Sequence, residues 1–283
     1  MSRNKERVGA HNANVETPQP NFNQDTSAGF SFVVPTEFVD LPSRGRYYPE
    51  GHPLHHQDTI EIRQMTAKEE DILTSRTLLK KGIALDRVLQ SVIVDKRINA
   101  ESMLVGDRNA AIMAMRISGY GADYETKVKC PACTASQKYS FNLAVVEPHH
   151  GGDLSTLGIV DNDNGTFDVE LPQTRVTVTF RLLTGYDENS LLSVTQKDRK
   201  RAEEKNVTRQ LENIIVAANG DTNPQAKKYL IDNIPSVDSR HLRLAFRLAC
   251  PNINLTQTFE CHECSFSQDM EVPLSADFFW PDR

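Results

Sequence analysis

Four of the five cysteines in this 283-residue chain stand in two Cys-x-x-Cys pairs, Cys130 with Cys133 and Cys261 with Cys264. Two thiolates at this spacing can share one tetrahedral Zn²⁺, because the two residues between them form a tight turn. One pair is half of such a site, and the other pair is the obvious source of the remaining ligands. The sequence therefore predicts a Cys₄ site for structural zinc that closes a long stretch of chain, an arrangement in which a crosslink stabilises strongly.

The same cysteines argue against a catalytic zinc site and against a redox site. Catalytic zinc needs an open coordination position, and four thiolates leave none. A redox Cys-x-x-Cys normally opens a helix, whereas both pairs here precede alternating runs typical of strands. His262, inside the second pair, could replace a cysteine as ligand, but a solvated side chain is the simpler interpretation. Cys250 has no paired neighbour and is interpreted as a buried apolar residue at the end of its helix.

The chain also contains an internal repeat around these pairs. At an offset of 131 residues, the segment from Asp107 to Leu143 matches the segment from Asp238 to Leu274, including an arginine 14 residues before the first cysteine. At an offset of 118 residues, IEIRQMTAKEEDIL (60–73) matches VTFRLLTGYDENSL (178–191). The alternative is that strand and helix patterns recur in any mixed protein and only the cysteines invite alignment.

Hydrophobic periodicity predicts an α+β fold built from these duplicated strand–helix units. FSFVVP (30–35) and 59–65 are expected as strands, a helix begins at Thr66 with a capping box to Glu69, and helices follow over 85–94 and 106–118. In the second half, 174–183 is expected as a strand and 238–249 as a helix. The predicted organisation is a polar extended or disordered arm (1–29), a first repeat (30–145), a linker loop (146–173) and a second repeat (174–283).

The composition argues against nucleic-acid binding, a membrane span and secretion. The net charge is −6 with 25% charged residues, so no basic excess favours nucleic acid. No apolar run reaches the length of a membrane span, and the first residues lack the apolar region of a secretory signal. A protein kept in a reducing cytosol, with proteins as partners, is expected.

Other candidate sites are weak. His52, His55 and His56, and His149 with His150, lie in Gly/Pro loops without a companion ligand at metal spacing. No phosphate-binding glycine loop, nucleophile elbow or HExxH motif is present. The run KDRKRAEEKN (197–206) reads as a solvated helix face. Arg116 and Arg247, within apolar helical stretches, are expected either to be exposed or to pair with carboxylates, Asp107 and Asp238 being one candidate set.

Several segments are distinctive in combination: LPSRGRYYP (41–49), IEIRQMTAKEEDILTS (60–75), GDRNAAIMAMRISGYGADYE (106–125), KCPAC (129–133) and the closing CSF with FFWP (264–281). Together they resemble the baseplate protein family of T-even-type contractile phages, which includes a hub subunit and a hub assembly catalyst. The resemblance runs from about residue 38 to the C-terminus.

The resemblance implies a baseplate protein without enzymatic activity, small-molecule substrate or cofactor other than metal, made in the bacterial cytoplasm and carried in the virion tail. Its partners would be other tail and baseplate proteins, with self-association a further possibility. Two roles remain open, a permanent structural part or a transient assembly factor. From the residues alone, a regulatory or nucleic-acid-binding zinc ribbon and a metal-dependent hydrolase using the loop histidines are the competing classes.

Overall fold

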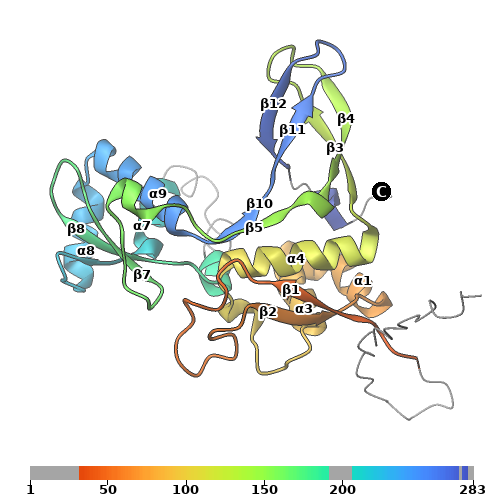
Figure 1. Ribbon diagram of the computed structural model, residues 1–283, viewed down its shortest axis with the longest axis horizontal. Coiled ribbons are helices and arrows are strands. Elements are labelled where there is room, and N and C mark those ends of the chain that lie inside the picture. The colour runs from red at the N-terminus through yellow and green to blue at the C-terminus, as the bar shows by residue number, and fades with distance from the viewer. Residues whose placement is uncertain (1–31, 191–205, 274–275, 280–283) are drawn as a thin grey trace, which may run out of the picture.

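The computed structural model describes residues 32–190, 206–273 and 276–279, and has the α+β character that the sequence predicts. It comprises three parts (Figure 1). An N-terminal lobe contains strands β1 and β2 with helices α1 to α4. A C-terminal lobe contains strands β6 to β9 with helices α7 to α9. A stalk of two hairpins, β3–β4 and β11–β12, rises above the N-terminal lobe. The predicted polar arm (1–29) lies outside the described residues, as does the expected solvated helix face (197–206) apart from Asn206.

The N-terminal lobe packs helices against a two-stranded sheet. Strand β1 (Thr36–Asp40) pairs antiparallel with β2 (Thr59–Arg63), and the helices are α1 (Ala67–Thr74), α2 (Arg76–Lys81), α3 (Ala84–Val92) and α4 (Val105–Tyr120), with a short 3₁₀ turn η1 (Ala100–Ser102). Alternate strand residues such as Val39, Ile60 and Ile62 are buried, because one face of the sheet lies on the helices. The predicted helix starts and ends agree closely with these bounds.

The C-terminal lobe contains a four-stranded antiparallel sheet in the order β6-β7-β8-β9. Its strands are β6 (Val160–Asp161), β7 (Thr166–Glu170), β8 (Thr177–Arg181) and β9 (Ile215–Ala218). Its helices are α7 (Asn206–Ile214), α8 (Pro224–Asn233) and α9 (Ser236–Ala249). The buried residues Phe167, Phe180 and Leu242 belong to its core.

Two sequence-based expectations are wrong in detail. The stretch 146–173, expected as a linker loop, carries strands β5 (Glu147–His149), β6 and β7 and the 3₁₀ turn η3 (Leu154–Leu157), because residues such as Phe167 and Val169 are buried in the sheet. The expected strand 30–35 begins later, at Thr36, although the Pro35 carbonyl still accepts a hydrogen bond from the Gln64 amide. Where the two repeat units begin and end remains a prediction.

The stalk consists of two separate hairpins. Strand β3 (Asp123–Lys129) pairs with β4 (Ser136–Asn142), and β11 (Thr256–Glu260) pairs with β12 (Ser267–Glu271). Side chains connect them: the Tyr139 hydroxyl donates to the Thr258 carbonyl at 3.1 Å, and the Tyr139 ring lies 5.0 Å from that of Phe259. Because the hairpins form two distinct sheets, their association depends on side chains and on whatever joins their tips.

After each hairpin the chain crosses to the helix of the other lobe. Strand β5, which follows the 3₁₀ turn η2 (Leu143–Val145), pairs with β10 (Asn252–Asn254), and the Gly152 amide then donates to the Leu248 carbonyl of α9. The 3₁₀ turn η4 (Ala276–Phe279) packs instead on α4, where Arg116 donates to the Phe278 carbonyl at 2.5 Å. This exchange ties the lobes and the stalk together (Figure 1).

The internal duplication is repeated in the hydrogen bonding. Arg63 forms a bidentate ion pair with Glu69, whose carboxylate also accepts from the Thr66 amide at 2.9 Å. In the C-terminal lobe Arg181 pairs in the same way with Asp187, which accepts from the Thr184 amide at 2.9 Å. Each arginine thereby anchors the last residue of a strand to the first turn of the segment that follows.

A second hydrogen-bonding arrangement also occurs in both lobes, and it involves Asp107 and Asp238. Both are almost fully buried and accept backbone amides from a Leu-Pro turn that follows a matching strand: Asp107 from Ser43 at 2.9 Å, and Asp238 from Gln173 at 2.8 Å. The suggested pairing of these carboxylates with Arg116 and Arg247 is therefore wrong. Arg116 is buried and donates to backbone carbonyls, including Gly121 at 2.7 Å, and Arg247 is exposed.

Candidate metal centre

The two Cys-x-x-Cys pairs form matching knuckles at the hairpin turns. In the first, the Cys130 amide donates to the Ala135 carbonyl and the Thr134 amide donates to the Cys130 carbonyl, both at 2.9 Å. In the second, the Cys261 and Ser265 amides make the equivalent bonds, again at 2.9 Å. Thr134 and Ser265 both have a left-handed backbone, with φ of 62° and 56°. A turn that tight directs the two thiols of each pair to one side.

The four sulfur atoms gather in one cluster, within 4.8 Å of one another. The Sγ atoms of Cys130 and Cys264 lie 3.8 Å apart, and those of Cys133 and Cys261 lie 3.7 Å apart. These distances exclude disulfides, whose sulfurs are about 2.05 Å apart. A regular tetrahedron of sulfurs about 2.3 Å from a central Zn²⁺ has edges of about 3.8 Å. The cross-hairpin distances therefore fit a tetrahedral thiolate site.

The thiols perturb each other's ionisation. Hydrogen bonds from backbone amides, that of Cys133 foremost, lower the pKa of Cys130 to about 7. The Phe266 amide acts in the same direction on Cys264, but desolvation and the three neighbouring thiols outweigh it and raise the pKa of Cys264 to about 12. Four thiolates this close repel one another strongly, so the cluster can ionise fully only around a cation.

Other polar groups hold the knuckles in register. The Gln137 side chain of β4 accepts a hydrogen bond from the His262 amide at 3.0 Å and donates to the Glu260 carbonyl at 3.2 Å. Gln137 Oε1 also lies 3.7 Å from the Cys261 sulfur. These contacts position the second knuckle against the first hairpin, and no motif in the sequence singles out Gln137 for this role.

The remaining sequence candidates do not join this cluster. His262 is exposed beside it, and Cys250 is half-buried, its pKa raised to about 11 chiefly by burial. Among the residues that the structure describes, only the four paired cysteines form a group able to hold a metal ion. The loop histidines make structural contacts instead: His52 with the Ser102 hydroxyl at 3.0 Å, and His55 with the Tyr48 carbonyl at 2.6 Å.

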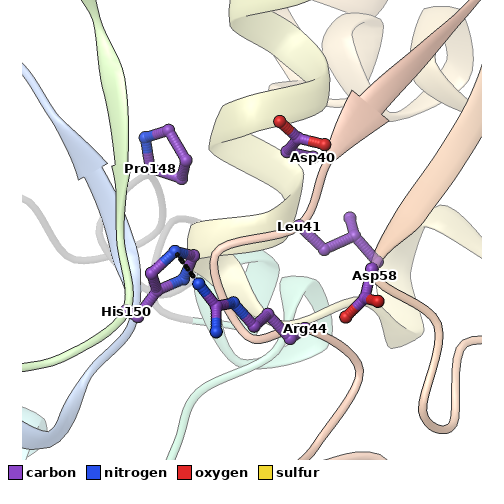
Figure 2. A pocket seen from close by; sticks show the side chains of 6 residues that line it. All are labelled: Asp40, Leu41, Arg44, Asp58, Pro148 and His150. Atoms are coloured by element: carbon purple, nitrogen blue, oxygen red, sulfur yellow. Dashed lines mark hydrogen bonds between the residues drawn. The ribbon is translucent and has the colours of Figure 1, made fainter.

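A small polar pocket of about 300 Å³ lies between the β1–β2 connection and β5 (Figure 2). Its lining residues are Asp40, Leu41, Arg44, Asp58, Pro148 and His150. His150 contacts both Arg44, at 3.0 Å, and the Pro42 carbonyl, at 2.8 Å. These contacts hold β5 beside the N-terminal lobe and give His150, one of the weak sequence candidates, a structural role.

Residues 35–159 match the family model described as T4 bacteriophage base plate protein, a span that includes the N-terminal lobe and the first knuckle. This part of the chain is similar to a T4-type phage baseplate protein, in agreement with the sequence motifs, and the similarity supports a baseplate-associated structural role. No curated protein and no solved structure matches it. None of the described helices is long and apolar enough to cross a membrane.

Proposed function

We propose that this chain is a permanent structural component of the tail baseplate of a contractile-tailed bacteriophage, acting through protein–protein contacts. The match of residues 35–159 to the baseplate family carries the proposal. The hydrogen bonds that join the two lobes and the stalk would make the chain rigid, as a structural component requires. The chain would be made in the host cytoplasm and retained in the finished virion.

Within that role, Cys130, Cys133, Cys261 and Cys264 would bind one structural Zn²⁺. The supporting observation is the tetrahedral spacing of thiols contributed equally by two hairpins. Zinc bound by four thiolates supplies a crosslink and no open position for substrate. Its function would be to lock together two hairpins that otherwise associate only through side chains.

The protein composition of purified virions tests the structural role. A permanent component is expected in every particle at a fixed ratio to the other baseplate proteins. The alternative is a transient assembly factor, which would be missing from mature virions although its deletion produces defective tails. Quantitative mass spectrometry of wild-type particles distinguishes the two, since the protein's absence from intact virions would contradict the proposal.

A further inference from the structure

The two hairpins of the stalk turn their outer faces in opposite directions. They stand side by side above α4, with the Tyr139 ring of β4 against the Phe259 ring of β11 (Figure 1). Because side chains alternate along a strand, the residues on either side of these two point away from the contact. Lys138 and Glu260 are accordingly exposed, whereas Phe141 and Phe259 are buried. Each hairpin therefore presents one face to the other hairpin and one face to solvent.

The outer face of the β3–β4 hairpin is basic toward its tip. Lys127 lies directly opposite Lys138 across the two strands, Lys129 is the next outward residue of β3, and all three are exposed. Asp123 and Glu125 lie on the same face nearer the base, and Glu125 reaches Lys138 only at 3.5 Å, in an ion pair too exposed to contribute much. Like charges directly opposite destabilise an antiparallel pair, so these lysines, here called the basic face, favour an anionic partner.

The outer face of the β11–β12 hairpin is acidic. Glu260, Asp269 and Glu271, here called the acidic face, are all exposed. Asp269 stands opposite Thr258, whose hydroxyl donates to its carboxylate at 2.7 Å, so both side chains lie on this outer face. Residues 255–273 contain no lysine or arginine, so the hairpin supplies no cation of its own to neutralise the three carboxylates. The acidic face therefore favours a cationic partner.

The internal duplication places the two sets of charges at equivalent positions. At the offset of 131 residues, Lys129 corresponds to Glu260 and Lys138 corresponds to Asp269. The strand pairing agrees with this correspondence, since Lys129 and Glu260 each stand opposite a serine. The two faces thus have the same strand geometry and opposite charge. They cannot meet within one chain, because they point away from each other on opposite sides of the stalk.

We propose that the basic face of one copy of this chain binds the acidic face of a second copy. A single two-fold axis cannot bring both faces of each stalk into one contact, because the faces point in opposite directions. The contact is therefore head-to-tail, and its repetition forms a closed ring or an open chain. This partner goes beyond the proposed structural role and does not rest on it, since the purified chain alone should associate.

Reversal of the charges on either face tests the contact. One variant carries Lys129→Glu with Lys138→Glu, and the other carries Glu260→Lys with Asp269→Lys. All four side chains are exposed, so both variants should fold with unchanged circular dichroism. At about 0.01 M salt, where the Debye length is about 30 Å, sedimentation velocity should show association of the wild-type chain that increases with concentration. Each variant should remain at the monomer mass of 31.8 kDa.

Salt and a charge-matched variant provide the controls. At about 1 M salt, where the Debye length is about 3 Å, the wild-type chain should also be monomeric. Lys68→Glu with Lys228→Glu makes the same change in net charge at exposed lysines of α1 and α8, away from the stalk. This variant should associate as the wild-type chain does, because both faces of its stalk are unchanged.

Mixing the two stalk variants is the sharpest test of charge pairing. Each variant alone lacks one of the two complementary faces, but the mixture brings a reversed basic face to a reversed acidic face. An equimolar mixture should therefore associate at about 0.01 M salt although neither variant does so alone.

Chemical crosslinking locates the contact. A carbodiimide joins a lysine amine to a carboxylate that touches it. In a mixture of isotopically light and heavy wild-type chains it should link Lys129 or Lys138 of one label to Glu260 or Asp269 of the other. The proposal is overturned by a wild-type chain that stays monomeric at low salt, by a stalk variant that associates as wild type does, or by a mixture of folded variants that stays monomeric. The absence of these crosslinks between the two labels also overturns it.

Discussion

At the scale of single residues, the ion pair between Arg63 and Glu69 connects the end of β2 to the start of α1. Glu69 is almost fully buried and also accepts hydrogen bonds from Thr66 and Ser91. Burial alone would raise its pKa, but the hydrogen bonds from Arg63, Ser91 and Thr66 outweigh burial and lower the pKa well below the ordinary value of 4.5. The ionised carboxylate is therefore part of what holds the lobe together.

Glu69→Gln should lower the free energy of unfolding by about 2 kcal/mol at pH 7, because it breaks a buried charge pair. Since the folded-state pKa lies below the unfolded one, the contribution is complete above about pH 5 and declines as the pH falls toward the folded-state pKa. Urea unfolding of both proteins across this pH range measures the difference. Glu70→Gln, at the exposed neighbour in α1, should change little; an equal loss there would contradict the account.

At the scale of elements, β10 crosses α4 at Gly106. A Cβ atom at this position would lie 2.0 Å from the Pro251 carbonyl oxygen, and backbone cannot move aside as a side chain does. Gly106→Ala should therefore destabilise the protein by about 2 kcal/mol despite the better helix propensity of alanine. Thermal unfolding with denaturant titration measures the effect.

Gly119 of the same helix is the matched control. A Cβ atom there would meet only the flexible end of the Met65 side chain, at 2.4 Å, so Gly119→Ala should be neutral or slightly stabilising. If both variants lose stability equally, helix geometry rather than the crossing of β10 explains the requirement for glycine.

Local sequence patterns predict many of the helices and strands, but they do not predict which distant elements pair with each other. Helical spacing predicts α4 and α9, and alternation predicts β2 and β8. The sequence alone does not reveal strand β9 (215–218), because IIVAA suits a helix as well as a strand. The pairing of Phe180 with Ile215 in the folded protein decides in favour of a strand. The pairing of β5 with β10 joins residues more than 100 positions apart, and neither segment, EPH or NIN, has an alternating apolar signal.

The candidate site was more predictable than the fold around it. Cys-x-x-Cys spacing encodes a local turn, so the four cysteines can be selected directly from the sequence. The polar contacts that align the knuckles, such as that of Gln137 with the His262 amide, cannot be predicted from the sequence. A glutamine on a strand has many possible roles. The same applies to Asp107, which the sequence suggested as a partner for arginine and which instead binds the Ser43 turn.

At the scale of the whole molecule, the cysteine cluster joins the ends of two hairpins that belong to different halves of the chain. Cys264→Ser should therefore lower metal affinity and the midpoint of thermal unfolding together, since metal binding contributes to folding. Cys250→Ser, which alters a thiol outside the cluster, should retain the metal. Limited proteolysis should then cut the hairpins faster in Cys264→Ser than in Cys250→Ser; equal rates would mean that the cluster does not hold the stalk.

Native mass spectrometry of the full chain, purified without chelator, tests whether the four cysteines bind a structural metal ion. We expect one Zn²⁺ per chain, bound with the loss of protons from the cluster thiols, and release of the metal on acidification. A metal-free chain with all five thiols free, or one with disulfides between the Cys-x-x-Cys pairs, would contradict it.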